Sequence, residues 1–250
     1  MNDNDTEEKS ITNSNTKTRK PRVKPEPLLK FYNENSDTIE IGVDEVGRGP
    51  LFGRVYTAAV ILPKDDSFEH SRMKDSKKFT SKQKIQQVAE YIKENAIAWS
   101  VTYKDEKTID EINILQATQQ SMHESIKDVL NKINNMSLEK NANQIHLLID
   151  GNYFNTFTIY NQSKQKLDTF NHTCIEGGDN KYSVIAAASI LAKVARDSYI
   201  EELCYLNPDL IVKYKIDSNK GYGAKAHLDG IKEYGITEWH RKTFGICKKY

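Results

Sequence analysis

The 250-residue chain has little cysteine and no long apolar run. Its three cysteines, Cys174, Cys204 and Cys247, are odd in number and form no Cys-x-x-Cys pair. That usage argues against a disulfide framework or a structural zinc site, and it fits a reducing compartment. No apolar stretch approaches the ~20 residues that span a bilayer, and the N-terminus lacks the apolar core of a secretion signal. We therefore expect a cytoplasmic protein without membrane attachment.

The chain also lacks an overall charge, since 36 Lys and Arg residues nearly balance 35 Asp and Glu residues. Charge is concentrated locally instead. Residues 71–84 hold six cations against Asp75 alone, and residues 213–250 hold nine cations against four acids. Two basic clusters around acidic motifs suit a polyanion held over a metal site, although lysine-rich surfaces are also common as plain solvated faces.

Residues 1–37 are polar, and no apolar residues recur before Leu28 and Leu29. This composition predicts a disordered polar tail that buries no face. A basic run at 17–24 could touch nucleic acid or serve as an address, but a solvated tail is the better interpretation. We expect the folded domain to occupy residues 38–250.

Residues 38–250 alternate between strand and helix patterns. Strands are predicted at 39–43, 54–62, 97–103, 144–149 and somewhere within 167–175. Helices are predicted at 80–95, with a capping pattern from Thr80, at 183–205 and at 224–234, together with a long helix after 103 that carries Leu115, Met122, Ile126, Val129 and Ile133 on one face. This order predicts an α/β domain with a mixed sheet, in which ligands sit outside the strand ends.

Carboxylates recur at the predicted ends of these elements. Asp44 and Glu45 follow the first strand, Asp150 ends the fourth, and Asp179 stands shortly before the helix at 183–205. Four unpaired carboxylates would repel one another unless a cation neutralised them, and their oxygens suit Mg²⁺ or Mn²⁺. If the two strands are neighbours, the sequence predicts a shared metal site, although each acid alone is typical of a turn or a helix cap.

A glycine-rich loop at residues 47–53 follows Asp44 and Glu45. Glycines let main-chain N–H groups approach a ligand that a Cβ would block. The loop is not a nucleoside-triphosphate P-loop, because no Lys-Ser or Lys-Thr pair follows it. No Cys-His or Ser-His-Asp arrangement is legible, so nucleophilic catalysis has little support. The loop and the two acids together indicate a site for a metal and a phosphate.

Residues 41–53 read IGVDEVGRGPLFG, which resembles the opening signature of the ribonuclease HII family. Further segments match the same family in the same order. They are 74–78 (KDSKK), 113–118 (NILQAT), 148–151 (LIDG), 178–179 (GD), 185–197 (IAAASILAKVARD), 220–223 (KGYG), His227 and 240–244 (HRKTF). The resemblance covers about residues 39–244, and a string of ordered motifs is far more specific than any one of them.

The resemblance implies a ribonuclease H-like fold, with a mixed central β-sheet flanked by helices and a helical C-terminal extension. It also implies an endonuclease that hydrolyses the RNA strand of RNA–DNA hybrids and incises at ribonucleotides embedded in DNA. Two divalent ions, Mg²⁺ or Mn²⁺, would serve the reaction, which leaves 3′-hydroxyl and 5′-phosphate ends. By position, Asp44, Glu45, Asp150 and Asp179 correspond to the family's metal-binding catalytic acids.

The resemblance also implies substrate contacts. Gly47, Arg48 and Gly49 correspond to the loop that senses the ribose 2′-hydroxyl, and Tyr222 to the tyrosine that packs against the sugar beside an RNA–DNA junction. The chemistry agrees, because a 2′-hydroxyl donates and accepts hydrogen bonds, a guanidinium suits phosphate and a phenol ring stacks on sugar or base. Without the resemblance, Arg48 equally suits a local salt bridge, and Tyr222 suits a half-buried aromatic position.

Lys181, Lys193 and Arg196 are further candidates to hold phosphates, the last two on one helix face at i and i+3. Arg196 suits pairing with acids in the core equally well. The chain departs from the family pattern at Phe52 and Arg54, where a small residue and proline are expected. These two flank the loop, so they bear on substrate fit more than on chemistry.

Three other interpretations compete. The related ribonuclease HIII shares the opening acids, but its loop lacks this Gly-Arg-Gly form and it carries a folded N-terminal domain, for which residues 1–37 are too short and polar. Another metal-dependent nuclease or strand-transferase of the same fold would keep the acids and lose ribonucleotide selectivity. A non-catalytic nucleic-acid-binding module is disfavoured, because acids repel phosphates unless a metal bridges them. We expect a monomer, and a replication-clamp partner is not readable from the sequence.

Overall fold

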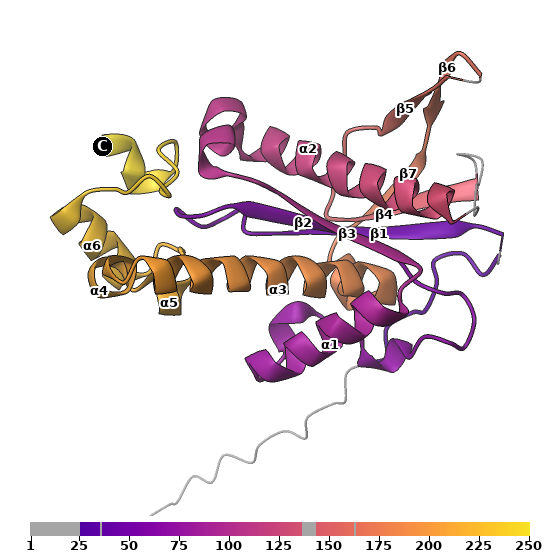
Figure 1. The fold of residues 1–250 in the computed structure, drawn as a ribbon, viewed down its shortest axis with the longest axis horizontal. Helices are drawn as coiled ribbons and strands as arrows, with labels where there is room; N and C mark the ends of the chain where they lie inside the picture. Colours follow the sequence, from indigo (N-terminus) through magenta and orange to yellow (C-terminus); the bar gives the residue numbers. More distant parts are fainter. Residues whose placement is uncertain (1–25, 36, 137–143, 163) are drawn as a thin grey trace, which may run out of the picture.

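A five-stranded mixed sheet forms the centre of the computed structural model, which describes residues 26–35, 37–136, 144–162 and 164–250 (Figure 1). Its strands are β1 (Ile39–Val46), β2 (Val55–Ile61), β3 (Ala98–Lys104), β4 (Ile145–Asp150) and β7 (Asn171–Ile175), in the order β3-β2-β1-β4-β7. The pairs β1–β2 and β2–β3 are antiparallel, whereas β4 runs parallel to β1 and β7 parallel to β4. The predicted mixed sheet is therefore confirmed.

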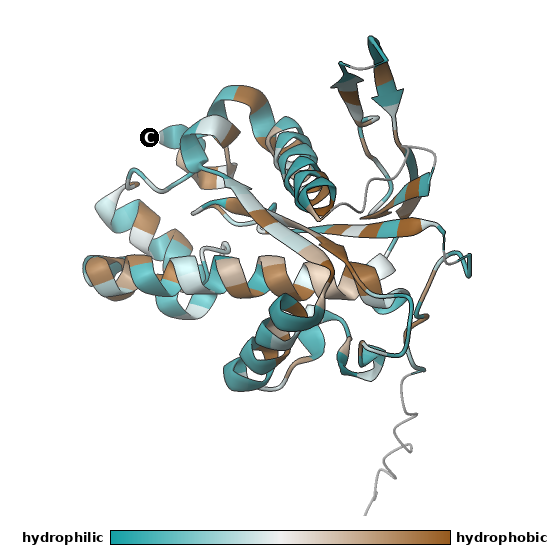
Figure 2. Ribbon diagram, turned by 45° about the vertical axis from the view of Figure 1, so that its right-hand side comes forward, coloured by the Kyte–Doolittle hydropathy of each residue, from teal (hydrophilic) through white to brown (hydrophobic). Residues whose placement is uncertain are grey.

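Helices cover both faces of this sheet. In Figure 1, α2 (Glu106–Asn135) lies over one face, and α3 (Ser183–Leu206) with α1 (Lys82–Asn95) lies under the other. Figure 2 shows hydrophilic residues on the outer sides of α1 and α2, whereas α3 and the strands are largely hydrophobic. The two largest apolar clusters of the core lie one on each side of the sheet, and this layering leaves the strand ends open as the place for a site.

The predicted stripe of α2 is buried against the sheet at Met122, Ile126, Val129 and Ile133, whereas Leu115 is only half-buried and lies outside that cluster. The reason is a break at Asn113, whose φ of 66° is not helical. The Asn113 side-chain oxygen accepts the Gln116 N–H at 3.1 Å and so caps the second segment of the helix. Leu115 thus lies in the first turn after the break.

The helix α3 packs unusually close to β1. A Cβ on Gly42 would lie 2.4 Å from the Val184 carbonyl oxygen, so only glycine permits this approach. The side chains of Ala186, Ala187 and Ala188 are fully buried in the same layer. Small residues here bring the N-terminal half of α3 onto the strand that carries Asp44.

Helices α4 (Asp209–Tyr214), α5 (Ile216–Asn219) and α6 (Lys225–Tyr234) form the predicted helical C-terminal extension, at the left of Figure 1. Sequence patterns predicted only α6, because α4 and α5 are too short to show a period and are separated by Lys215 at φ 54°. The hairpin of β5 (Thr158–Asn161) and β6 (Lys166–Thr169) was also missed. No helix among the described parts of the chain is both long and apolar enough to cross a membrane.

Two boundaries differ from the predictions. The N-cap of α1 is Ser81, whose hydroxyl accepts the Lys84 N–H, and not Thr80. Part of the predicted tail lies on the domain, because Leu29 exchanges main-chain hydrogen bonds with Lys181 and Ser183 at 2.8 and 3.0 Å. The remaining tail residues 1–25, including the basic run at 17–24, lie outside the described residues.

Candidate active site

The register of β1 on β4 brings two of the predicted acids together. Val43 pairs with Ile149 in the parallel ladder, so Asp44 and Asp150 occupy equivalent next positions on neighbouring strands. Asp44 is 4 % exposed, and its carboxylate accepts the Glu45 N–H at 2.6 Å. The predicted metal site required these two strands to be neighbours, and β1 and β4 are paired. Asp44 does not follow the first strand but lies within β1, two residues before its end.

Glu45 follows Asp44 on the same strand, where regular alternation would point it to the opposite face of the sheet. Its charge nevertheless raises the pKa of Asp44, so its carboxylate stays within electrostatic reach of the other acids at this strand end. Gly42, two residues before Asp44, faces α3, whereas Val43 belongs to the core beneath α2. The Glu45 carboxylate lies 3.5 Å from the Arg48 guanidinium, so the local salt bridge considered for Arg48 is present. Arg48 is otherwise about half exposed and remains available to a second anion.

Asp179 reaches the site from a short 3-10 helix, η4 (Gly178–Asn180). The Asp150 carboxylate accepts the Gly178 N–H at 2.6 Å, which ties this turn to the end of β4. Asp179 is buried, and the Asn180 side-chain amide donates to it at 3.0 Å. Asp44, Glu45, Asp150 and Asp179 are hereafter the acid cluster.

Like charges and burial raise the pKa values within the acid cluster. Burial raises the pKa of Asp44 well above its usual value, and the charges of Glu45 and Asp150 add to the effect. Burial and Asp150 raise the pKa of Glu45 to about 7, against the opposing charge of Arg48. Burial also raises the pKa of Asp179, followed by the charges of Asp150 and Asp75. Without a cation, the cluster resists full ionisation.

The donor set fits a hard divalent cation. All four groups are carboxylates, whose oxygens suit Mg²⁺ or Mn²⁺, and neither cysteine nor histidine accompanies them. A bound cation would relieve the repulsion between these carboxylates. Among the described residues, no three carboxylate, imidazole or thiol side chains already converge into a metal cage.

The glycine loop, residues 47–53, begins directly after β1. Gly47 has a φ of +100°, and a Cβ there would lie 2.4 Å from the Arg196 side chain, so the position excludes other residues. A Cβ on Gly49 would meet only the Tyr222 ring, at 3.5 Å. Gly49, Arg48 and Tyr222 are all exposed, and they form one surface beside the acid cluster.

Arg241, to which the sequence assigned no role, anchors the glycine loop. Its buried guanidinium donates hydrogen bonds to the carbonyl oxygens of Gly47, Arg48, Pro50 and Gly53 at 2.6, 3.0, 2.9 and 2.8 Å. The main chain of the same segment pairs with the loop, since the Arg241 N–H donates to the Leu51 carbonyl at 2.8 Å. The only sequence signal was the match of residues 240–244 to a family motif.

Two of the three predicted phosphate contacts are engaged within the protein. Arg196 is 1 % exposed and donates to the main-chain carbonyls of Phe52 and Lys220, so it braces the loop instead of pairing with core acids. Lys193 forms an ion pair with Asp197 at 2.7 Å. Lys181 has an exposed side chain two residues after Asp179, open to solvent beside the acid cluster.

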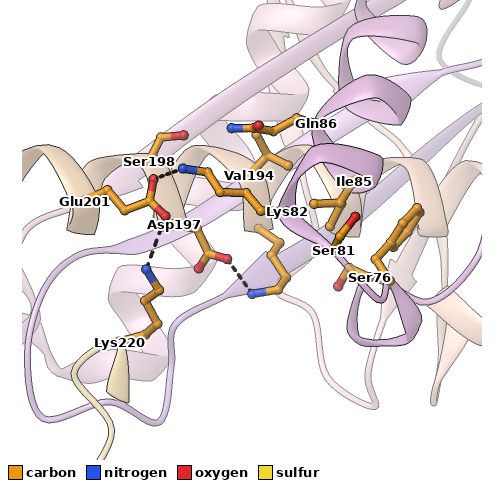
Figure 3. Close-up of a pocket in the computed structure, with 12 residues that line it drawn as sticks. Ser76, Ser81, Lys82, Ile85, Gln86, Val194, Asp197, Ser198, Glu201 and Lys220 are labelled. Carbon is orange, nitrogen blue, oxygen red and sulfur yellow. Dashed lines mark hydrogen bonds and ion pairs between the residues drawn. The ribbon is translucent and has the colours of Figure 1, made fainter. Parts of the chain in front are cut away.

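Lys193 also lines a pocket of about 200 Å³ between α1 and α3, shown in Figure 3. Its other two lysines, Lys82 and Lys220, both bind the Glu201 carboxylate. Ser76 also lines this pocket, and its hydroxyl hydrogen bonds with Ser189 of α3 at 3.0 Å. Each of the three lysines is already engaged by a carboxylate of Asp197 or Glu201, so the pocket offers no unpaired lysine to an anion.

Asp75 is a buried carboxylate next to the acid cluster that the sequence did not single out as a site residue. It caps the 3-10 helix η2 (Ser76–Lys78) by accepting the Lys77 N–H at 2.8 Å. The Asn180 amide bridges it to Asp179, at 3.3 Å from Asp75. Its position in the basic segment 71–84 places that segment next to the acid cluster.

Comparisons with known proteins agree with this geometry. The sequence model described as Ribonuclease HII matches residues 41–247. Ribonuclease HII of Bacteroides thetaiotaomicron is 42 % identical over 219 residues, which cover 88 % of this chain and 94 % of the relative. The match thus spans the acid cluster, the glycine loop and Arg241.

Solved structures share the fold at low identity. Ribonuclease HII of Archaeoglobus fulgidus, solved in complex with PCNA, superimposes with a TM-score of 0.57 at 21 % identity, over 83 % of this chain and 96 % of that one. Bst-RNase HIII in complex with Mn²⁺ superimposes with a TM-score of 0.60 at 20 % identity, over 86 % of this chain and 69 % of that one. Both support the predicted ribonuclease H-like architecture.

Proposed function

The chain belongs to the ribonuclease HII family and is a ribonuclease H enzyme, and on that premise we propose that it cuts the RNA strand of RNA–DNA hybrids and incises DNA at embedded ribonucleotides. The observation that carries the proposal is the juxtaposition of two features. Asp44 and Asp150 stand at equivalent positions of paired parallel strands, and the glycine loop begins three residues after Asp44. The groups proposed for phosphodiester cleavage and for ribose recognition thus lie together at the C-terminal ends of β1 and β4.

The acid cluster would hold two divalent ions, Mg²⁺ or Mn²⁺. When bound, such ions supply an activated water and stabilise charge on the leaving 3′-oxygen, so that the products carry 3′-hydroxyl and 5′-phosphate ends. The protein's part is to keep four carboxylates close despite their repulsion. The Gly178 N–H on Asp150 and the Asn180 amide on Asp179 fix two of them in place.

Ribonucleotide selectivity rests on the surface formed by Gly49, Arg48 and Tyr222. An RNA-specific contact must read the 2′-hydroxyl, and main-chain groups of an exposed glycine can approach it without a Cβ in the way. The Tyr222 ring borders Gly49 and offers a face for the sugar at the RNA–DNA junction. Arg48 is half exposed beside Glu45 and suits the scissile or adjacent phosphate.

Basic residues near the acid cluster suit the rest of a polyanionic duplex. Lys181 follows Asp179, and the segment 71–84 adjoins it through Asp75. Phosphate contacts of this kind position a duplex without reading sequence. We propose that the enzyme works as a monomer in the cytoplasm, where a bacterial cell keeps its DNA.

The test is cleavage of an end-labelled DNA duplex that carries one ribonucleotide, with Mg²⁺ or Mn²⁺, beside a long RNA–DNA hybrid and a matched all-DNA duplex. We expect cuts at the ribonucleotide and along the RNA strand, with ligatable 3′-hydroxyl ends. Equal cutting of the all-DNA duplex would instead indicate a general nuclease of the same fold. Absence of cutting on all three substrates would contradict the proposal.

A further inference from the structure

We propose that Arg241 is a positioning residue of this enzyme, and that its buried guanidinium aims the glycine loop at the ribose 2′-hydroxyl. The inference rests on the proposed function and adds a residue that touches neither metal nor substrate. It starts from an unusual set of contacts, because one side chain binds four main-chain carbonyls of a single seven-residue loop.

The four contacts use almost the whole donor capacity of an arginine. A guanidinium has five N–H groups in a rigid planar fork. Nε binds Gly53, Nη1 binds both Arg48 and Pro50, and Nη2 binds Gly47. A lysine has three donors on one atom, so it cannot span carbonyls at both ends of the loop. The geometry therefore requires arginine and not merely a positive charge.

The contacts fix which way the loop's N–H groups point. The described peptides are all trans, and in a planar trans peptide the N–H points away from the carbonyl of the same unit. Because the carbonyls of Gly47 and Arg48 point inward to Arg241, the N–H groups of Arg48 and Gly49 point outward. No main-chain oxygen of the described residues accepts from these two N–H groups. They face the side on which Arg48 and Gly49 are exposed and Tyr222 lies.

Arg241 is well placed to hold this arrangement rigidly. It is 0 % exposed, and burial, with the nearby charge of Arg196, lowers its pKa to about 9, so it remains protonated at neutral pH. Buried hydrogen bonds from a charged donor are strong, and breaking them leaves unpaired carbonyls. Its own main chain is tied to the loop through Leu51, and that of Trp239 through Gly53. Main-chain and side-chain contacts of Trp239 and Arg241 thus hold the conformation of the loop.

The experiment measures single-turnover cleavage of a duplex with one ribonucleotide, with enzyme in excess, for wild type, Arg241→Ala and Arg241→Lys. Under these conditions the plateau rate belongs to correctly folded molecules, whereas loss of folded enzyme only raises the half-saturating concentration. We expect the plateau rate to fall at least ~30-fold in both variants, because a misplacement of about 1 Å can cost roughly 100-fold. Lys127→Met, which removes an exposed cation of α2 outside the loop and both basic clusters, controls for lost charge and should stay within about two-fold.

Chemical rescue separates positioning from general structure. Methylguanidinium at tens of millimolar should raise the plateau rate of Arg241→Ala several-fold, whereas ammonium at the same ionic strength should not. Gly49→Ala, whose Arg241 is intact, should show no rescue. If Arg241→Ala does not fold, Arg241→Lys carries the same test, with the plateau rate and the thermal melt measured on one sample.

A plateau rate unchanged in folded Arg241→Lys, with only the half-saturating concentration shifted, would overturn the inference. Failure of the proposed function would look different, because the wild-type enzyme itself would then fail to cut at the ribonucleotide. A reduced plateau rate that methylguanidinium restores would support both the positioning role of Arg241 and the proposed function.

Discussion

The acid cluster and the glycine loop lie side by side, yet the protein holds them by opposite means. In the acid cluster, like charges are buried together, and burial with mutual repulsion raises the pKa values of Asp44 and Glu45. In the glycine loop, main-chain carbonyls are matched by donors of Arg241 and Arg196. The acid cluster therefore keeps uncompensated negative charge, whereas the carbonyl groups of the glycine loop find hydrogen-bond donors within the chain.

This difference indicates how much each region depends on a bound ligand. Carboxylates that are buried close to like charges are costly to ionise, so the acid cluster gains most from a cation. The glycine loop needs no ligand to take its shape, and pre-formed donors lose little entropy on binding. Substitutions should therefore act differently in the two regions: neutralising an acid should abolish activity while sparing the fold, and disturbing the loop's packing should harm both.

Asp44→Asn should give the largest loss of activity. We expect cleavage to fall by roughly 10³-fold or more, because metal stabilisation of a transition state is worth several kcal/mol. In EDTA, the variant should melt no lower than wild type, since it removes a buried charge that Glu45 and Asp150 oppose. Mn²⁺ should raise the melting temperature of wild type and leave that of the variant nearly unchanged.

Asp168→Asn is the matched control for this prediction, because it removes a carboxylate from the remote β5–β6 hairpin. Its cleavage rate and its response to Mn²⁺ should match those of wild type. Near-normal activity in Asp44→Asn, or unfolding as the sole cause of its loss, would remove Asp44 from the acid cluster's proposed role.

A pair of alanine substitutions should divide the glycine loop into a packed and an open part. Gly47→Ala should lower stability by at least about 1–2 kcal/mol, because a non-glycine residue at φ +100° is strained and its Cβ would clash with Arg196. Gly49→Ala should fold normally, since its Cβ meets only ordinary contact with Tyr222, but it should cleave every ribonucleotide-containing substrate more slowly. Thermal melts and kcat/KM on both variants make the comparison, and equal melting temperatures would contradict it.

Tyr222→Ala should affect one substrate more than another. Loss of a stacking contact costs ~1–3 kcal/mol, roughly 5- to 150-fold in rate or affinity, and should fall most on a single ribonucleotide flanked by DNA. A continuous RNA–DNA hybrid offers many registers and depends less on the junction. The measurement is the ratio of kcat/KM on the two substrates in variant and wild type. Equal losses on both would remove junction sensing from Tyr222.

A buried histidine pair should make stability depend on pH. His240 Nδ1 accepts the Thr237 N–H, so its Nε2 donates to His227 Nε2 at 3.0 Å, and His227 Nδ1 donates to the Tyr222 carbonyl. This chain requires both rings to be neutral. Burial and the neighbouring His227 lower the pKa of His240 to about 3, far below the value near 6.5 in the unfolded chain.

Since only the unfolded chain takes up this proton between pH 6.5 and 3, each pH unit in that window should cost up to about 1.4 kcal/mol of stability. Carboxyls with raised pKa values contribute the opposite slope, so the informative quantity is the difference between wild type and His240→Gln. Urea unfolding from pH 7.5 to 4.5 measures it, and the two stabilities should converge or cross as pH falls. Parallel curves would contradict the neutral pair.

Truncation should have the smallest effect. We propose that residues 1–25 are dispensable, so their deletion should leave turnover at low salt nearly unchanged. Deletion through Asn33 should lower the melting temperature, because it removes the main-chain bonds of Leu29 and the Tyr32 and Asn33 N–H groups that bind Glu40. Identical melts of the two truncated proteins would contradict this boundary.

The sequence predicted the parts whose signal is local. Apolar runs and alternation predicted the five strands of the sheet, the fifth only within the range 167–175, and the position of Asp44 after such a run predicted its place near a strand end. The pairing of Asp44 with Asp150 remained conditional, because register depends on contacts about 100 residues apart. Arg241 was beyond reach for the same reason, since its partners lie 188–194 positions earlier in the chain.

Short elements escaped for a different reason. Helices α4 and α5 and the β5–β6 hairpin contain four to six residues per element, fewer than a period needs to stand out. The break in α2 at Asn113 is a single residue with positive φ. Asparagine tolerates this conformation, but its presence in a sequence does not predict it. Arg196 suited a phosphate equally well from its residue type, and only its burial and its hydrogen bond to the Phe52 carbonyl assign it to the loop.

Cleavage of a duplex containing one ribonucleotide, followed as Mn²⁺ is titrated into metal-free enzyme, tests the central claim most directly. We predict no cutting in EDTA, a rise to saturation with Mn²⁺, and incision at the ribonucleotide while a matched all-DNA duplex stays intact. Cutting without a divalent ion, or cutting of the all-DNA duplex at a similar rate, would contradict it.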